Sequence, residues 1–161
     1  SRGLGDVYKR QELEFDLYLS RIKAQSQQKV FEELGTEVCP LCGVREETMR
    51  DAITQRLSER TFGMGDGVAI FDLRDPFIKR PVSVIATLEH DVDFKALDDK
   101  PVNIIAAILS PQSDGPKHLQ RLSVLSRVMR SEKLQEALRD VSSEDEMRAL
   151  FMPSQDWMVA A

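Results

Sequence analysis

The sequence is poor in the features that mark secreted, metal-binding and membrane-inserted proteins. Two cysteines in 161 residues are too few for the disulfide framework of a small secreted domain. No apolar run approaches the roughly 18 residues of a membrane-spanning helix, and no charged stretch followed by an apolar one resembles a signal peptide. We therefore expect a cytoplasmic protein with no membrane insertion, no cofactor and no metal site.

Basic residues are also scarce relative to acidic ones. The chain has 22 Lys and Arg against 27 Asp and Glu, a net charge of −5. Nucleic acids and anionic membranes are bound through concentrated Lys and Arg, so this balance argues against nucleic acid as a partner. A hydrophobic content of 42% at this length fits one domain with a core large enough to fold alone.

The hydrophobic pattern divides the chain into three parts. Residues 1–11 have no apolar period, and we interpret them as a non-native leader. Residues 12–152 carry periodic patterns and form the predicted domain, and residues 153–161 form a tail.

Strand and helix patterns alternate within the predicted domain. Alternating residues at 13–19 predict a half-buried first strand, and Gly35 is the expected stop of the first helix. The continuously apolar run 103–109 is typical of a strand buried on both faces. The alternation predicts layers of α/β or α+β type. The predicted strands are 13–19, 68–73, 82–88 and 103–109, and the predicted helices are 20–34, 46–59, 116–129, 131–138 and 144–151.

Turn residues, a strand and a candidate site meet in residues 61–74. Glycine alternates at 63, 65 and 67, where the backbone can take positive φ or allow a close approach. The dipeptide Asp66-Gly67 favours a tight turn, and the run that follows is rich in strand-forming residues. Asp72 and Arg74 are therefore expected at the end of a strand.

Residues 61–72, with the sequence TFGMGDGVAIFD, resemble a family signature. It is the Ser-Thr-Gly-x-Gly-x-Gly-x-Ala-Ile-Pro-His run of enzyme IIA domains in the fructose/mannitol/nitrogen-regulatory branch of the bacterial phosphotransferase system, nearest the nitrogen-regulatory members. Residues 92–102 are similar to a second segment, Val-Asp-Phe-x-Ala-x-Asp-x-x-Pro-Val. The resemblance covers about residues 13–152. It implies an α/β (α+β mixed) fold with a roughly five-stranded mixed sheet and helices on both faces.

The most informative residue departs from the signature. The family accepts phosphate on the signature histidine from the histidine-containing phosphocarrier protein, and Asp72 stands at that position here. The resemblance also implies roles for two further residues. His118 matches a second histidine beside the acceptor, in a His-Leu-x-x-Leu motif, and Arg56 matches an arginine that precedes the Ser-Thr. Without the resemblance, a lone helix histidine and a solvated helix-end arginine would be ordinary.

Three more residues complete the candidate phosphate-binding set. Gly65 and Gly67 belong to the glycine run, and Arg74 lies two residues beyond Asp72. A carboxylate at the acceptor position could be a permanent, partial stand-in for the phosphorylated state, held by Arg56, Arg74 or His118. The alternative is a local ion pair with Arg74 that signals nothing.

The replacement of the histidine decides the predicted function. A carboxylate brings negative charge toward a negative phosphoryl donor, so we predict a regulatory protein that has lost phosphoryl transfer and is not an enzyme. It would act by binding a transporter, kinase or metabolic enzyme. One alternative is an active phosphotransferase-system phosphocarrier that accepts on Asp72 or His118. Another is a redox-responsive binding module using Cys39 and Cys42, although two small apolar residues at a turn between helices are the simpler and favoured explanation of that pair.

Overall fold

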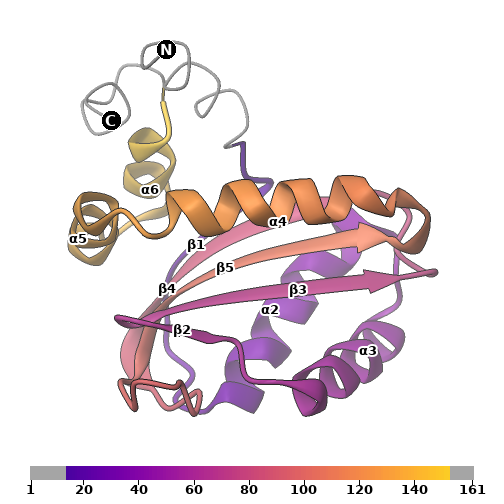
Figure 1. The fold of residues 1–161 in the computed structure, drawn as a ribbon, viewed down its shortest axis with the longest axis horizontal. Coiled ribbons are helices and arrows are strands. Elements are labelled where there is room, and N and C mark those ends of the chain that lie inside the picture. Colours follow the sequence, from indigo (N-terminus) through magenta and orange to yellow (C-terminus); the bar gives the residue numbers. More distant parts are fainter. Residues whose placement is uncertain (1–13, 153–161) are drawn as a thin grey trace.

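The computed structural model describes residues 14–152, which form a mixed five-stranded sheet with helices on both faces (Figure 1). The predicted fold class is confirmed. The predicted leader at 1–11 and the tail at 153–161 lie outside the described residues. The strands are β1 (Leu17–Ile22), β2 (Gly63–Gly65), β3 (Val68–Asp75), β4 (Val82–Val92) and β5 (Val102–Pro111). The helices are α2 (Gln27–Cys42), α3 (Glu46–Glu59), α4 (Pro116–Val128), α5 (Glu132–Asp140) and α6 (Glu144–Leu150), with a 3-10 turn η1 (Gln112–Asp114) before α4.

The strand order is β1-β4-β5-β3-β2, with β5 at the centre. Strands β3 and β5 run parallel, and Asp72 lies opposite Ile108 while Arg74 lies opposite Ser110. Because parallel strands end at the same edge of a sheet, the last residues of β3 and β5 meet there. Strand β4 pairs antiparallel with β5 and parallel with β1.

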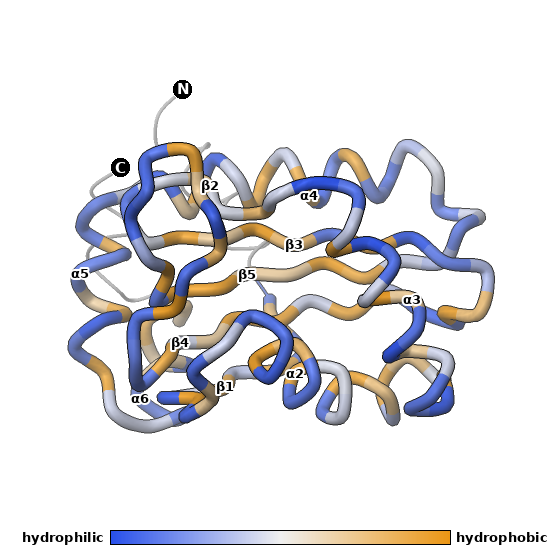
Figure 2. The backbone as a smooth tube through the Cα atoms, turned by 90° about the horizontal axis from the view of Figure 1, so that it is seen from below, coloured by the Kyte–Doolittle hydropathy of each residue, from blue (hydrophilic) through white to orange (hydrophobic). Residues whose placement is uncertain are grey.

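Two apolar cores lie on opposite faces of the sheet. Helices α2 and α3 pack Phe31 and Ile53 against Phe71 on one face. Helices α4, α5 and α6 cover the other face, where Leu125 and Leu134 belong to the second core. Figure 2 shows the apolar colour following β3, β5 and β4 through the middle of the molecule. In residues 14–152, no helix combines the length and apolar character needed to span a membrane.

The first helix lies later in the chain than the sequence pattern predicts. The prediction of residues 20–34 is wrong, because Ser26 caps α2 by accepting from the Lys29 N–H at 3.2 Å. Gly35 does not stop the helix. It lies inside α2, where a Cβ would be 3.3 Å from Cδ1 of Ile53, so its small size permits close packing against α3. The helix ends instead at Gly43, which has φ 70°.

The first strand is also displaced and is covered on both sides. Strand β1 begins at Leu17 and continues to Ile22, and Leu13 lies outside the described residues. Tyr18 is buried with Phe151 on the α6 side, whereas Leu17 packs partly against the other core. Tyr18 and Ile22 are buried while Leu17 and Leu19 are partly buried, so burial does not follow one side of the strand, because helices cover both faces of the sheet.

The buried stripe of α4 differs from the predicted one at its start. The apolar spacing in the sequence, at Leu119, Leu122, Leu125, Ser126 and Met129, predicts that Leu119 faces the core, but its side chain is 60% exposed. His118 is buried instead, together with Leu125, Val128 and Met129. The buried face thus begins with a polar residue, which reaches the strand ends below the helix.

Candidate functional site

The candidate site lies where β3 and β5 end beside the first turn of α4. Asp72 comes from β3, Ser110 from β5 and His118 from α4. Gly115 takes φ 51° and Pro116 occupies the first turn of α4, so the chain reverses sharply enough to place His118 over the strand ends. The side chain of His118 is 1% exposed and that of Asp72 is 12% exposed.

Both carboxylate oxygens of Asp72 have a donor. Arg56 Nη2 donates to Oδ1 at 2.9 Å, and His118 Nε2 lies 2.9 Å from Oδ2. Arg56 also donates through Nε to the backbone oxygen of Asp72 at 2.9 Å and through Nη1 to Glu59 at 2.8 Å. The planar donor fork of Arg56 therefore holds both the side chain and the backbone of Asp72.

These contacts keep the Asp72–Arg56 pair charged. Burial alone would raise the pKa of Asp72, but hydrogen bonds from His118 and Arg56 and the positive charge of Arg56 outweigh it, so the pKa lies below its usual range. Burial would lower the pKa of Arg56, but hydrogen bonds to Glu59 and Asp72 outweigh this effect, so the pKa lies above its usual value. Asp72 is thus ionised at neutral pH and can only accept hydrogen bonds.

A second layer of polar residues supports His118 from its other side. The Ser110 Oγ lies 2.8 Å from His118 Nδ1 and accepts from Arg121 Nη1 at 3.0 Å. Arg121 Nη1 also donates to Asp114 at 2.8 Å. Neither Ser110 nor Arg121 was predicted from the sequence as a site residue. One available signal was that Arg121 lies three residues after His118, on the same side of the helix.

The structure does not bring the other predicted phosphate-binding residues to Asp72. Arg74 is exposed, and the carboxylate of Asp72 pairs with Arg56 instead. Gly67 is five residues from Asp72 along an extended strand, a separation of about 16 Å. A Cβ on Gly67 would lie 2.8 Å from Arg139, and one on Gly65 would lie 3.3 Å from Asp98, so both glycines serve the turn at the opposite end of β3.

The cysteine pair lies in the last turn of α2 rather than in a turn between helices, so that prediction is wrong. Both thiols are free and buried. Burial raises the pKa of Cys39, and it raises the pKa of Cys42 to about 12. Because the thiolate is the reactive form, this environment gives the redox alternative no support.

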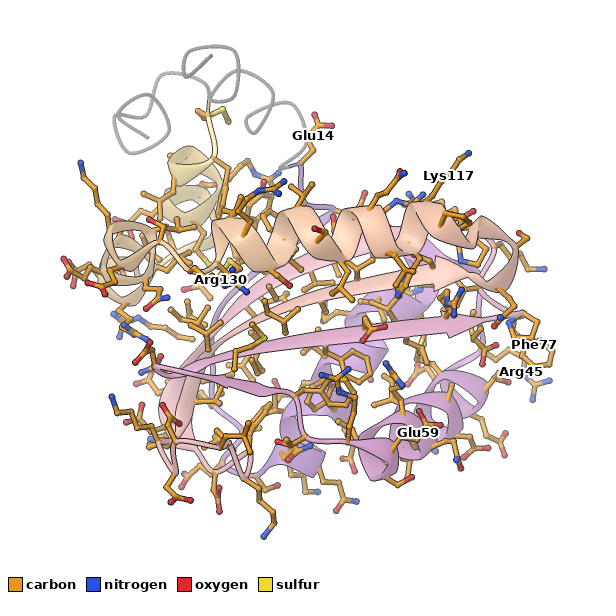
Figure 3. The ribbon with its side chains drawn as sticks, in the orientation of Figure 1. Glu14, Arg45, Glu59, Phe77, Lys117 and Arg130 are labelled. Carbon is orange, nitrogen blue, oxygen red and sulfur yellow. The ribbon has the colours of Figure 1, made fainter. Side chains whose placement is uncertain are left out.

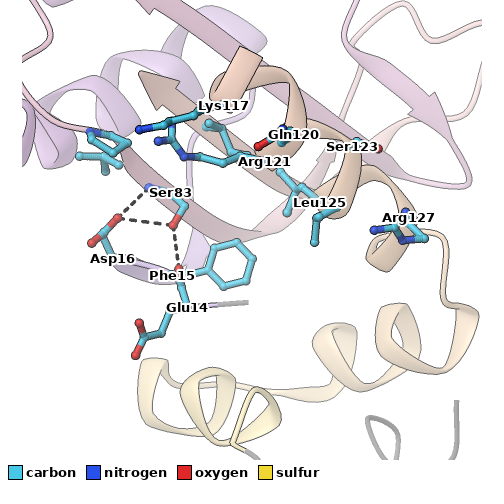
Figure 4. Close-up of a pocket in the computed structure, with 14 residues that line it drawn as sticks. Glu14, Phe15, Asp16, Ser83, Lys117, Gln120, Arg121, Ser123, Leu125 and Arg127 are labelled. Atoms are coloured by element: carbon cyan, nitrogen blue, oxygen red, sulfur yellow. Dashed lines mark hydrogen bonds between the residues drawn. The ribbon is translucent and has the colours of Figure 1, made fainter. Parts of the chain in front are cut away.

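A groove of about 850 Å³ lies beside the site but does not contain it (Figure 4). Its walls are the segment before β1, including Phe15, and the side of α4 that carries Lys117, Arg121 and Arg127. Arg121 is the residue that the groove shares with the polar layer behind His118. The carboxylate of Asp72 and the imidazole of His118 are buried between α4 and the sheet, away from this groove.

The fold and the site together define a domain of enzyme IIA type. Residues 15–152 match the family model described as phosphoenolpyruvate-dependent sugar phosphotransferase system, EIIA 2. The chain belongs to this family.

Individual relatives agree with that assignment. A nitrogen regulatory protein of Bradyrhizobium diazoefficiens is 28% identical over 121 residues, which cover 75% of this chain and 79% of that protein. A PTS system fructose-specific EIIA component of Haloferax volcanii is 36% identical over 94 residues, 58% of this chain and 61% of that protein. The crystal structure of nitrogen regulatory protein IIA-Ntr from Neisseria meningitidis has a TM-score of 0.77 and 28% identity, and the match covers 84% of this chain and 92% of that one. The predicted resemblance to the nitrogen-regulatory branch is confirmed, and the chain is a regulatory or phosphocarrier protein of the phosphotransferase-system type.

Proposed function

We propose that this chain is a regulatory enzyme IIA-type protein that takes up no phosphate at Asp72 and acts by binding partner proteins. The observation that carries the proposal is the occupation of both Asp72 carboxylate oxygens, Oδ1 by Arg56 and Oδ2 by His118. An attacking oxygen would have to leave one of these charge-assisted hydrogen bonds. Its negative charge would also repel a phosphorylated donor.

His118 offers no better acceptor. Its side chain is 1% exposed, and each ring nitrogen lies within hydrogen-bonding distance of a neighbour, Ser110 on one side and Asp72 on the other. Nucleophilic attack needs a free nitrogen lone pair that faces the phosphoryl donor. This geometry supports the proposal over the alternative of an active phosphocarrier that accepts on Asp72 or His118.

The fixed charge at Asp72 suits a partial stand-in for a phosphorylated state. A carboxylate carries one negative charge, whereas a phosphoryl group carries about −1.5 to −2 with three acceptor oxygens. Arg56 and His118 are the donors that such a charge would engage, and both engage Asp72. Under this proposal the partner meets a surface held in one signalling state.

Exposed apolar side chains near the site are the proposed partner surface. Leu119 directly follows His118 and is 60% exposed, and Phe77 is 62% exposed. Figure 3 shows Phe77 beyond the end of β3. Large exposed apolar side chains beside a charged site are features that a partner covers on binding. The proposed partners are a regulated transporter, kinase or metabolic enzyme, or the phosphocarrier protein itself.

The first test of the proposal is phosphate uptake. We expect the chain to keep its unmodified intact mass after incubation with phosphoenolpyruvate and the complete phosphorelay, including the phosphocarrier protein. A family member that carries the signature histidine is the positive control. An added phosphoryl group on the chain would overturn the loss of transfer, and its stability in acid or base would distinguish an acyl phosphate from a phosphohistidine.

The second test concerns the partner surface. We expect Leu119→Glu to reduce the amount of partner captured from a lysate of the source organism by about tenfold, since truncating a central contact often costs more than about 1 kcal/mol. Leu97→Glu is the matched control, because Leu97 is 92% exposed and precedes β5, at the opposite end of that strand from Ser110. Equal capture by both variants, measured by quantitative mass spectrometry, would place the partner surface elsewhere.

A further inference from the structure

We infer that Ser110 and Arg121 are positioning residues that hold His118 in its neutral Nε2–H tautomer, so that the imidazole donates to the anion at position 72. The inference rests on the proposed function, in which that anion sets the signalling state. It concerns residues behind the imidazole, on the side opposite Asp72.

Arg121 determines the direction of the hydrogen bond between Ser110 and His118. A guanidinium has only donors, so Arg121 Nη1 donates to Ser110 Oγ at 3.0 Å. A serine hydroxyl has one proton of its own to give. The other side-chain contact of Ser110 Oγ is to His118 Nδ1 at 2.8 Å, and Ser110 is fully buried. The hydroxyl proton therefore points to Nδ1, which accepts.

The hydrogen bond between His118 and Asp72, on the other side of the ring, agrees with an Nδ1 that accepts. Asp72 is ionised and only accepts, so His118 Nε2 must carry the proton that points to Oδ2 at 2.9 Å. The opposite tautomer would place a nitrogen lone pair against a carboxylate oxygen and two donors against the Ser110 oxygen. A doubly protonated ring would leave the buried Ser110 proton facing a donor. The network therefore favours the neutral Nε2–H form.

Arg121 is itself fixed before it reaches Ser110. The same Nη1 donates to Asp114 at 2.8 Å, and Asp114 belongs to the 3-10 turn that precedes α4. Asp114 does not cap the helix with its side chain. This ion pair thus ties the first turns of α4 to the chain segment that leaves β5, and it aims one guanidinium nitrogen at Ser110.

The consequence is that the donor facing Asp72 depends in part on residues that no hydrogen bond joins to Asp72. Removing the Ser110 hydroxyl leaves Nδ1 without its donor, so Asp72 alone then favours the proton on Nε2, and the two neutral tautomers differ less in free energy. Only one of these offers an N–H to the carboxylate. A merely space-filling role for Ser110 would leave the proton on Nε2.

The test is nitrogen-15 NMR of the histidine side chains in the full chain at neutral pH. We expect His118 Nδ1 to resonate as an unprotonated nitrogen and Nε2 as a protonated one. In Ser110→Ala both resonances should move toward each other, and in Arg121→Met they should move in the same direction by less. Ser110→Thr keeps a hydroxyl and should restore the wild-type pattern. Ser123→Ala and Arg127→Met are matched controls at exposed positions of α4 and should change nothing.

Two results would overturn the inference. One is a protonated Nδ1 in the wild-type chain, and the other is an unchanged proton position in both Ser110→Ala and Arg121→Met. If Ser110→Ala does not fold, as judged by circular dichroism, Arg121→Met decides the outcome alone. Neither measurement involves phosphate or a partner, so a failure here leaves the proposed loss of transfer intact, and phosphate uptake by the wild-type chain would leave the tautomer assignment intact.

Discussion

Replacing Arg56 with methionine is expected to lower the free energy of unfolding by about 2–4 kcal/mol, because it strips a mostly buried carboxylate of its charged partner. The side chain of Asp72 is 12% exposed and that of Arg56 is 24% exposed, so water replaces the lost contacts poorly. The variant also loses the Arg56 Nε bond to the Asp72 backbone oxygen. Chemical denaturation at neutral pH measures the loss.

The charge, rather than the volume of the side chain, should cause this loss. Arg50→Met is the control, since Arg50 is an exposed arginine on the same helix, and its effect should stay within about 0.5 kcal/mol. The pKa of Asp72 is lowered in the folded state, so its contribution is present above the unfolded value of about 3.9 and is lost as the pH falls through the folded value. The difference between wild type and Arg56→Met should therefore narrow below about pH 4. A difference that does not change with pH would show that packing, not the ion pair, is responsible.

Local signals predicted some elements closely. Helix α3 spans Glu46–Glu59, the bounds expected from its apolar spacing and from the two acidic residues in its first turn. Strand β3 begins at Val68, directly after the Asp66-Gly67 turn. In both cases the residues that define the element lie within it or directly before it, so no distant contact was needed.

Tertiary pairing decided the elements that the sequence pattern misplaced. Residues 20–22 continue β1 because that strand pairs with β4, and the irregularity there places Arg21 at φ 55° with its N–H bonded to Thr87. Thr87 is 66 residues away, so no local period contains this information. The helix that was expected to begin at residue 20 therefore begins only after Ser26, which supplies its N-cap.

The residues of the candidate site that match family motifs could be predicted from the sequence, and the residues that match no motif could not. Asp72, His118 and Arg56 were singled out together, and the structure joins them within hydrogen-bonding distance. Gly65 and Gly67 were included because the signature is contiguous in sequence, but an extended strand carries them away from Asp72. Ser110 and Arg121 carry no motif, and their contact spans 11 residues between a strand end and a helix face. Only the fold reveals that both lie behind His118.

Restoring a histidine at the acceptor position should restore phosphate uptake. We expect Asp72→His to change the chain from no detectable phosphorylation to a readily detected phosphorylated fraction in the complete phosphorelay. A neutral imidazole removes the negative charge that faces the donor, and it frees Arg56 Nη2 for a phosphoryl oxygen. In the transfer, a bond forms between phosphorus and the introduced ring nitrogen as the phosphorus–nitrogen bond of the donor breaks.

Phe71 should be kept in this experiment, although the family signature has proline there. Its ring is buried, with its centroid 4.8 Å from that of Phe31 and 4.9 Å from that of Phe62. Phe71→Pro would remove this ring and a backbone N–H from an interior strand, at a cost of at least about 3–5 kcal/mol. A double variant that fails to take up phosphate would therefore report on folding rather than on the acceptor.

Two matched variants separate the acceptor from its surroundings. Asp72→Asn removes the same charge but offers no nucleophile, so its intact mass should stay unmodified. Asp72→His combined with Arg56→Met keeps the nucleophile but loses the donor that holds the phosphoryl oxygens, so its phosphorylated fraction should fall well below that of Asp72→His alone. A folded Asp72→His chain that stays unphosphorylated would show that the carboxylate is not what blocks transfer, and the cause would then lie in how the surface around Phe77 and Leu119 meets the phosphocarrier protein.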